Sequence, residues 1–255
     1  MSSTASGSST VSSPESAPRP ITRLENHDQI LAMAARLPRG RVLDAPCGQG
    51  ALSARLAEAG FRVACADVDP GLFRVPGLSV RPVELNQGKL PFEDGVFDLV
   101  VSVNGLHRLW NPAHAVAEYA RVLAPGGVLL CSVPNYAQIS RRLRFLLGGG
   151  IARNISRLAT EHTDAEPAAN FRQPLLLSQL LDAFERAGLE LESLESAQRK
   201  RTGLAWRVLA AAIRGLARFT SKRNREVFAA ELGNSDAVLL GSHHLYLRAS
   251  KPVSA

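Results

Sequence analysis

Short apolar runs that alternate with helical patterns constrain the fold of this chain more than any other feature of its sequence. The clearest run, Phe97–Val103, is almost entirely apolar, which is typical of a parallel strand covered on both faces. The other predicted strands are Arg41–Asp44, Arg62–Ala66, Leu78–Val83, Val128–Val133, Leu189–Leu194 and His244–Ala249. The predicted helices are Asp28–Leu37, Ala51–Ala59, Ala113–Leu123 and Leu175–Ala187, with a further helical region over 203–232. This order predicts an α/β fold in which helices cover both faces of a parallel sheet.

The composition divides the chain into a tail and one domain. Residues 1–20 are mostly Ser, Thr, Ala and Pro, without the basic start and apolar run of a secretory signal, and are predicted to be disordered. Residues 21–255 are predicted to form a single domain: a cofactor-binding core (21–135), a substrate-facing region with the helical insert (136–232), and a final strand and tail (233–255). Three widely spaced cysteines lack metal-ligand spacing, and their odd number without a signal favours a cytoplasmic protein.

The positive charge of the chain is concentrated in one region. Residues 141–225 hold 16 Lys and Arg against 8 Asp and Glu, which is an excess of positive charge. The net charge of the whole chain is +7. Such an excess suggests an anionic partner, although a solvated surface explains it equally well. Nucleic acid is a weak candidate, because aromatic residues make up only 5% of the chain and form no stacking platform. The segment 141–150, basic and apolar with three glycines at its end, is interpreted as a possible lid.

The insert contains a basic amphipathic segment over residues 204–219. Its apolar face is predicted from helical spacing as Trp206, Leu209, Ile213 and Leu216, and its basic face as Arg207, Arg214 and Arg218. Such a helix could lie peripherally on an anionic membrane. The alternative is an ordinary helix that packs on the sheet with its arginines in solvent. A transmembrane segment is not predicted, because arginines interrupt this longest apolar stretch.

Polar residues follow three of the predicted strands, where ligands of parallel sheets bind. The first strand leads into Asp44-Ala45-Pro46-Cys47-Gly48-Gln49-Gly50, in which the glycines permit close approach of a ligand to the backbone. Asp67 follows the second strand and is placed to accept hydrogen bonds from ribose hydroxyls. Glu84 follows the third. A nicotinamide site is disfavoured, because Ser53 stands at the third glycine position and Asp44 suits an ammonium group better than a pyrophosphate.

From about Val42 to Asn135 the sequence resembles the class I S-adenosylmethionine-dependent methyltransferases, in their type 11-like, small-molecule branch. The resemblance rests on four motifs, namely Asp44–Gly50, Ala66–Pro70, Leu90–Asp98 and the Arg-Val-Leu-Ala-Pro-Gly-Gly turn at Arg121–Gly127. It implies a Rossmann-like, doubly wound sheet of seven strands, mostly parallel with the last strand antiparallel, and S-adenosyl-L-methionine as the cofactor.

The resemblance also implies roles for individual residues. Asp44 and the backbone of Ala45, Gly48 and Gly50 would hold the methionine part of the cofactor. Asp67 would bind the ribose, and Val68 would lie against the adenine. Glu84 and the backbone of Leu85 would contact the adenine side, and Asn104 would lie where cofactor and substrate meet.

Candidate catalytic residues come from the segment after the fourth strand and from one later histidine. Related sequences often carry Leu-Glu-His-Leu after the fourth strand, whereas this chain has Leu106-His107-Arg108-Leu109. A hydroxyl acceptor would need a base, for which His107 and His162 are the candidates. Asn135 and Tyr136 could orient the substrate. Two functions therefore stay open: methyl transfer to a quinone-, lipid- or sugar-linked small molecule, and a binding or regulatory protein that keeps the fold without activity.

Overall fold

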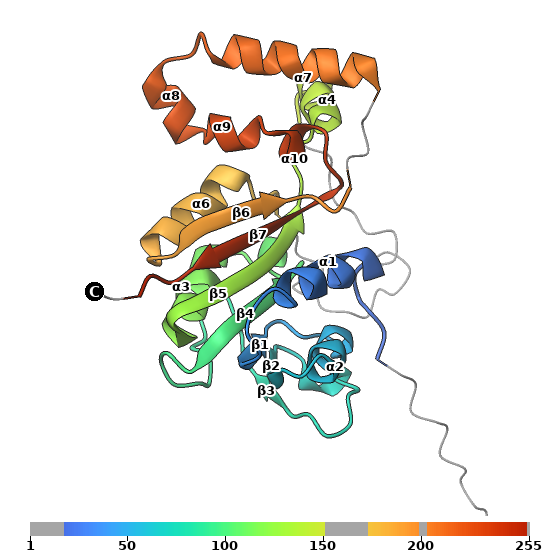
Figure 1. The fold of residues 1–255 in the computed structure, drawn as a ribbon, viewed down its shortest axis with the longest axis vertical. Coiled ribbons are helices and arrows are strands. Elements are labelled where there is room, and N and C mark those ends of the chain that lie inside the picture. The colour runs from blue at the N-terminus through green and yellow to red at the C-terminus, as the bar shows by residue number, and fades with distance from the viewer. Residues whose placement is uncertain (1–17, 151–172, 199–202, 254–255) are drawn as a thin grey trace, which may run out of the picture.

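The computed structural model describes residues 18–150, 173–198 and 203–253, and its centre is a seven-stranded sheet (Figure 1). The strand order is β3-β2-β1-β4-β5-β7-β6. The strands are β1 (Arg41–Asp44), β2 (Arg62–Asp67), β3 (Val80–Pro82), β4 (Phe97–Val103), β5 (Leu123–Pro134), β6 (Glu190–Glu195) and β7 (His244–Ser250). The pairs from β3 to β5 are parallel, and β7 runs antiparallel to both of its neighbours. The predicted doubly wound sheet with an antiparallel last strand is confirmed.

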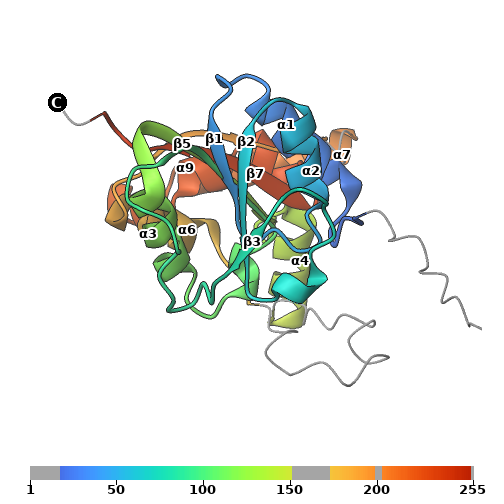
Figure 2. The ribbon, with the colours of Figure 1, turned by 90° about the horizontal axis from the view of Figure 1, so that it is seen from below.

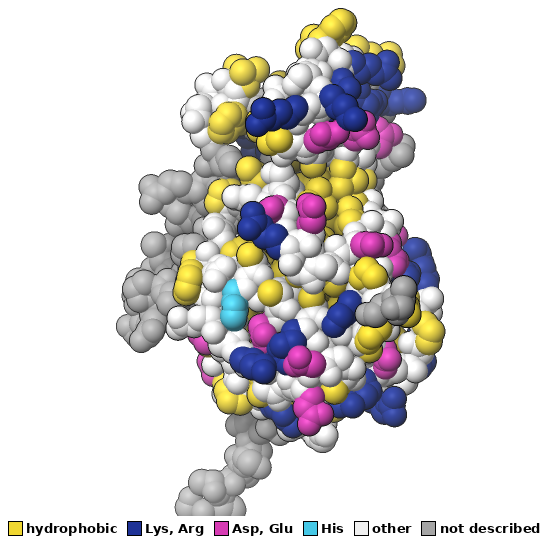
Figure 3. All heavy atoms as spheres, turned by 90° about the vertical axis from the view of Figure 1, so that its left-hand side faces the viewer, with side chains coloured by type: hydrophobic (Ala, Val, Ile, Leu, Met, Phe, Trp, Pro, Cys, Tyr) yellow, Lys and Arg dark blue, Asp and Glu magenta, His cyan; other side chains and the backbone are white. Residues whose placement is uncertain are grey.

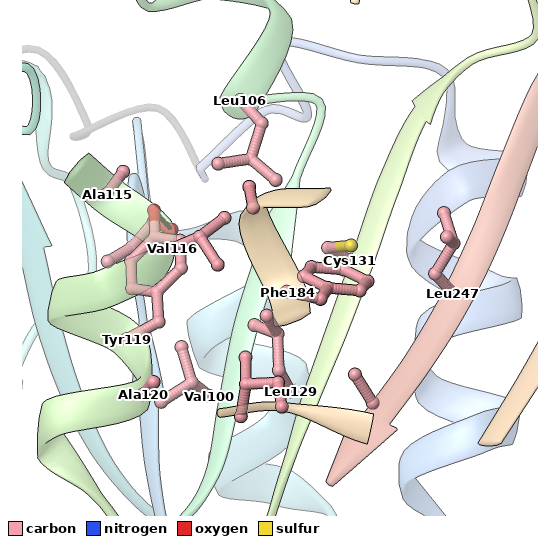
Figure 4. Packing of buried hydrophobic residues seen from close by; sticks show 14 of the residues in the cluster. Val100, Leu106, Ala115, Val116, Tyr119, Ala120, Leu129, Cys131, Phe184 and Leu247 are labelled. Carbon is pink, nitrogen blue, oxygen red and sulfur yellow. Dashed lines mark hydrogen bonds between the residues drawn. The ribbon is translucent and has the colours of Figure 1, made fainter. Parts of the chain in front are cut away.

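Helices cover the two faces of this sheet (Figure 2). On one face lie α1 (Leu24–Ala34) and α2 (Ala51–Glu58), and on the other lie α3 (Pro112–Val122) and α6 (Leu177–Arg186). Successive residues of a strand point to opposite faces, so Leu99 and Val101 pack under α1 and α2, whereas Val100 packs under α3. Figure 4 shows the core between the sheet and the helices α3 and α6, where Tyr119 and Phe184 contact residues of the strands. Each apolar run therefore supplies both cores.

Element boundaries differ from the prediction mainly where long-range contacts set them. The helix α1 begins at Leu24 rather than Asp28 and ends at Ala34. The strand β5 begins at Leu123 rather than Val128, because Leu123 pairs with Phe97 before the ladder resumes at Val128 with a shift in register. The segment interpreted as a possible lid forms a helix, α4 (Ile139–Gly148), which ends at Gly149 in the left-handed conformation.

The helical insert forms a lobe beside the sheet, at the top of Figure 1. It consists of α7 (Leu204–Ala217), α8 (Lys222–Val227), α9 (Ala230–Gly233) and α10 (Asp236–Leu239). A small core joins it to α4, with Ala210 of α7 buried against Ile139, Leu239 and Leu240.

Two 3-10 helices, η1 (Pro70–Leu72) and η2 (Leu106–Arg108), follow β2 and β4. Within the described residues, no helix combines the length and apolar character needed to cross a bilayer.

Candidate functional site

A cleft of about 1040 Å³ opens at the carboxyl ends of β1, β2 and β4. The chain leaves β1 through α2 toward β2, and leaves β4 through α3 toward β5, on the opposite side of the sheet. The cleft therefore lies at the point where the strand order reverses, which is where open α/β sheets bind ligands. The predicted site residues among its lining are Asp44, Gly48, Asp67, Val68, Glu84, Leu85, Asn104 and His107.

Asp44 is the most deeply buried charged group of the site, with 2% of its surface exposed. Its Oδ2 accepts a hydrogen bond of 2.6 Å from the hydroxyl of Ser53, in the first turn of α2. Burial raises the pKa of Asp44 from 3.8 to about 7; the Ser53 hydrogen bond opposes that rise, and the nearby Asp67 charge adds to it. A cationic ligand would relieve the cost of the buried carboxylate, because it would replace lost water with an opposite charge.

The loop Asp44–Gly50, here called the glycine loop, is hydrogen-bonded directly to Asp67 at the end of β2. The Gly48 amide donates a hydrogen bond of 2.7 Å to Asp67 Oδ2, and the Asp69 amide donates one of 3.1 Å to Asp67 Oδ1. Gly50 starts α2 with a φ of 84°, and a Cβ there would lie 2.5 Å from Cγ2 of Val75. Only glycine fits at this position, because both its backbone conformation and its surroundings exclude a side chain.

Two of the predicted cofactor residues, Ala45 and Gly50, do not line the cleft. The Ala45 amide donates to the Val101 carbonyl in the sheet, and its carbonyl accepts a hydrogen bond of 2.8 Å from the Tyr119 hydroxyl. Both backbone groups of Ala45 therefore have partners within the protein. The Gly50 amide likewise donates to the Cys47 carbonyl. These residues shape the loop from beneath.

Glu84 follows β3 and Asn104 follows β4, so they lie on opposite sides of Asp44 and Asp67, which end β1 and β2. Glu84 Oε1 accepts hydrogen bonds from the backbone and side-chain amides of Asn86, at 3.0 and 2.6 Å. Asn104 adopts the left-handed conformation with a φ of 53°, which is uncommon for a residue other than glycine. Its Nδ2 donates to Thr22 Oγ1 at 2.6 Å, and its buried Oδ1 has no donor among the described residues. A ligand with a donor could satisfy this oxygen.

The segment before α1 is part of the site, which the sequence did not indicate. Arg19, Pro20, Ile21 and Thr22 all line the cleft, so the prediction of a disordered tail over residues 1–20 is wrong for Arg19 and Pro20. The Arg19 amide donates to Gln49 Oε1 at 3.0 Å. A Cβ on Gly48 would lie 2.7 Å from the Ile21 side chain, so this segment passes closely over the glycine loop. Local patterns cannot reveal such a contact, because it depends on the chain folding back.

The two histidine candidates have different outcomes. His107 lies in η2, is 6% exposed and lines the cleft directly after β4. His162 lies outside the described residues. A third histidine, His27 of α1, also lines the cleft, and its burial lowers its pKa to about 4, with the Arg55 charge contributing. Asn135 and Tyr136 are not among the lining residues. The Asn135 side-chain amide instead holds the Val238 carbonyl of the lobe at 2.8 Å.

Known proteins resemble the chain in this same region. A family model described as a methyltransferase domain matches residues 43–131. The chain is 32% identical to a Mycolicibacterium smegmatis protein named "Probable S-adenosylmethionine-dependent methyltransferase", over 64% of this chain and 63% of that protein. It is 34% identical to the demethylmenaquinone methyltransferase of Thermus thermophilus, over 50% of this chain and 68% of that enzyme.

Among solved structures, a SAM-dependent methyltransferase from Archaeoglobus fulgidus matches with a TM-score of 0.51 at 14% identity, over 88% of this chain and 94% of that one. This likeness shows the fold. The matched segments cover between 39% and 71% of the length of eight curated relatives. The sequence similarity to those relatives therefore extends over only part of the length of each relative.

Proposed function

Because this chain belongs to the S-adenosylmethionine-dependent methyltransferases, we propose that it transfers the methyl group of this cofactor to a small apolar acceptor held in the same cleft. The observation that carries the proposal is the meeting of Asp44, Asp67 and Glu84, from the ends of three neighbouring strands, in one cleft. Its volume of about 1040 Å³ is at the upper end for small-molecule sites, which leaves space for an acceptor beside the cofactor.

The residues of the cleft fit the cofactor chemically. S-adenosylmethionine, when bound, supplies a methyl group on a sulfonium, which is a good leaving group. The Asp44 carboxylate suits the ammonium group of its amino-acid part, and Asp67 suits ribose hydroxyls. The unpaired Oδ1 of Asn104 offers one more acceptor. These residues hold the donor in place, so that transfer depends chiefly on aligning the acceptor with it.

A quinone-like ring is the acceptor that we favour. Leu72, which ends η1, and Leu109 and Trp110, which follow η2, line the cleft and supply apolar side chains to it. The curated relatives named as demethylmenaquinone methyltransferases support the same class of acceptor. His107 stands in the cleft directly after β4, and we assign it the task of taking the proton of an acceptor hydroxyl.

Calorimetric titration with S-adenosylmethionine and S-adenosylhomocysteine tests the cofactor site. We expect Asp67→Asn to weaken binding about 10- to 100-fold, because it removes a charged hydrogen-bond acceptor. Asp69→Asn is the matched control: it lies two residues away, does not line the cleft and caps the Gly71 amide. Equal binding by wild type and Asp67→Asn, in well-folded protein, would refute the assignment of the site.

Turnover separates the two remaining functions. We expect radiolabelled methyl groups to appear in demethylmenaquinone analogues with short side chains. Tight cofactor binding without transfer to quinone, lipid or glycan acceptors would instead favour a regulatory protein that has kept the fold.

A further inference from the structure

The helix α7 has apolar side chains on two opposite faces, and only one of them is covered. Trp206, Leu209 and Ile213 pack inward against the small core of the lobe. These residues are most of the face that the sequence offered to a membrane, so that face is not available. The outward face carries Leu204 and Val208, which are 76% and 60% exposed, and Phe219, which follows the end of the helix, is 90% exposed.

A surface helix normally turns charged or polar residues to the solvent. Here the outward positions between the three large residues are Ala211, Ala212 and Gly215, which add no polar group. Leu216, the fourth member of the predicted apolar face, is also 70% exposed. The adjoining helix α8 ends at exposed Val227, followed by exposed Phe228. We call Leu204, Val208, Leu216, Phe219, Val227 and Phe228 the outer lobe face. An exposed apolar patch of this kind marks an interaction surface.

Positive charges predominate around the outer lobe face. Residues 203–228 contain six Lys and Arg against one acid, Glu226. Arg207 and Arg218 are exposed along one border of α7, and Lys222 and Arg223 follow in α8. Arg214 pairs with Asp236 at 2.9 Å and Lys222 with Glu226 at 3.8 Å, and Arg225 donates to the Arg218 and Thr220 carbonyls. Figure 3 shows Lys and Arg gathered beside hydrophobic side chains at the top of the molecule, where Figure 1 places the lobe.

We propose that the outer lobe face docks on an anionic phospholipid bilayer, with α7 lying in the plane of the interface. Apolar side chains would enter the boundary of the acyl chains while the bordering arginines meet the headgroups. The helix has 14 residues and is about 21 Å long, too short to cross the bilayer but long enough to lie on it. A second copy of the chain is a poorer partner, since two such basic faces would repel each other.

The position of the lobe connects this surface to the cleft. The helix α4 follows the carboxyl end of β5, and α10 precedes the start of antiparallel β7. Both helices therefore adjoin the ends of the strands at which the cleft opens. His244, the first residue of β7, lines the cleft. A docked molecule would therefore hold its cleft near the bilayer, where an apolar acceptor concentrates. This last consequence rests on the proposed function, whereas the docking itself does not.

Vesicle sedimentation tests the docking. We expect the full chain to sediment with phosphatidylcholine vesicles that contain about one third phosphatidylglycerol, to bind pure phosphatidylcholine weakly, and to dissociate as salt is raised. Val208→Ser/Phe219→Ser should weaken binding at least about tenfold, and Arg207→Gln/Arg218→Gln about five-fold for each arginine. Val253→Ser and Arg62→Gln are the matched controls, because both residues are exposed and lie outside the lobe.

Three results would overturn the proposal: no sedimentation of the wild type with anionic vesicles, equal sedimentation with pure phosphatidylcholine, or a wild-type dimer that Val208→Ser/Phe219→Ser dissociates without any vesicle binding. Titration of each variant with S-adenosylmethionine, without vesicles, keeps the two proposals apart. We expect the lobe variants to bind the cofactor like the wild type, so loss of vesicle binding alone bears on the membrane surface.

Discussion

At the scale of single residues, Asp44 shows how a binding site conflicts with stability. Its carboxylate is nearly excluded from water, and its folded pKa of about 7 lies above the ordinary value of 3.8. Between these two pH values the folded chain binds more protons at this residue than the unfolded chain does. Stability therefore falls as pH rises from about 4 to about 7, and the loss stays constant above that range. A bound ammonium group would reverse this preference.

We expect Asp44→Asn to stabilise the protein while it abolishes tight cofactor binding. The gain in free energy of unfolding should grow from near zero at pH 4 to about 4 kcal/mol above pH 7, which is the free energy of a pKa shift from 3.8 to about 7. Urea unfolding of both proteins at pH 5 and pH 8 measures it. Wild-type affinity for the cofactor should also fall about tenfold per pH unit below 7. A gain that is the same at both pH values would contradict the role of ionisation.

His107 gives a second prediction at this scale. If it accepts the acceptor's proton, His107→Gln should lower kcat by about 100- to 10,000-fold and leave the affinity for S-adenosylmethionine unchanged. The control is His114→Gln; His114 contacts the Gly88 carbonyl at 3.2 Å and does not line the cleft. Unchanged turnover in His107→Gln would leave the chain without an identified base among the described residues.

At the scale of elements, the segment before α1 joins the site through one hydroxyl. Thr22 Oγ1 accepts hydrogen bonds from the side-chain amides of Asn104, at 2.6 Å, and of Asn26, at 2.5 Å. Thr22→Val keeps the shape but leaves both amides without this acceptor. We expect cofactor affinity to fall about five- to tenfold, at a cost of roughly 1–2 kcal/mol in stability. Ile21→Val, which shortens the neighbouring side chain, should have little effect; similar affinity in both variants would show that the hydroxyl does not matter.

Elements also show what the sequence could and could not predict. The strands Arg41–Asp44 and Phe97–Val103 match to the residue, because each apolar run ends where the chain enters a polar turn. The acids at the strand ends could be predicted for the same reason. The exposed face of α7 could not, since periodicity shows which residues share a face but not which face meets the protein. The roles assigned to the cofactor residues, and the division at residues 135 and 232, stay predictions.

At the scale of the whole molecule, three cores of unequal size hold the chain together. The two sheet cores are extensive, whereas the lobe core, among the residues that the structure describes, has four buried members, Ile139, Ala210, Leu239 and Leu240. Few buried apolar contacts mean a low free energy of local opening. The lobe should therefore open independently of the sheet.

Hydrogen exchange measures this difference. We expect amides of α7 to exchange at a lower free energy of opening than those of β4 and β5, and Ile139→Ala to speed exchange in the lobe alone. Ile30→Ala, in the core beneath α1, is the control that should lower protection across the sheet. Equal protection of α7 and β4 would show that the molecule opens as one unit.

The place of β7 has a consequence for synthesis of the chain. Strand β6 reaches the rest of the sheet through β7, which follows it by about fifty residues, after the lobe. At ribosomal speeds of about 5–20 residues per second, several seconds pass in which β6 has no partner and β5 keeps one open edge. Nascent chains are prone to pair with one another through such edges. The lobe is made during that interval, so its length sets how long these strand edges stay open.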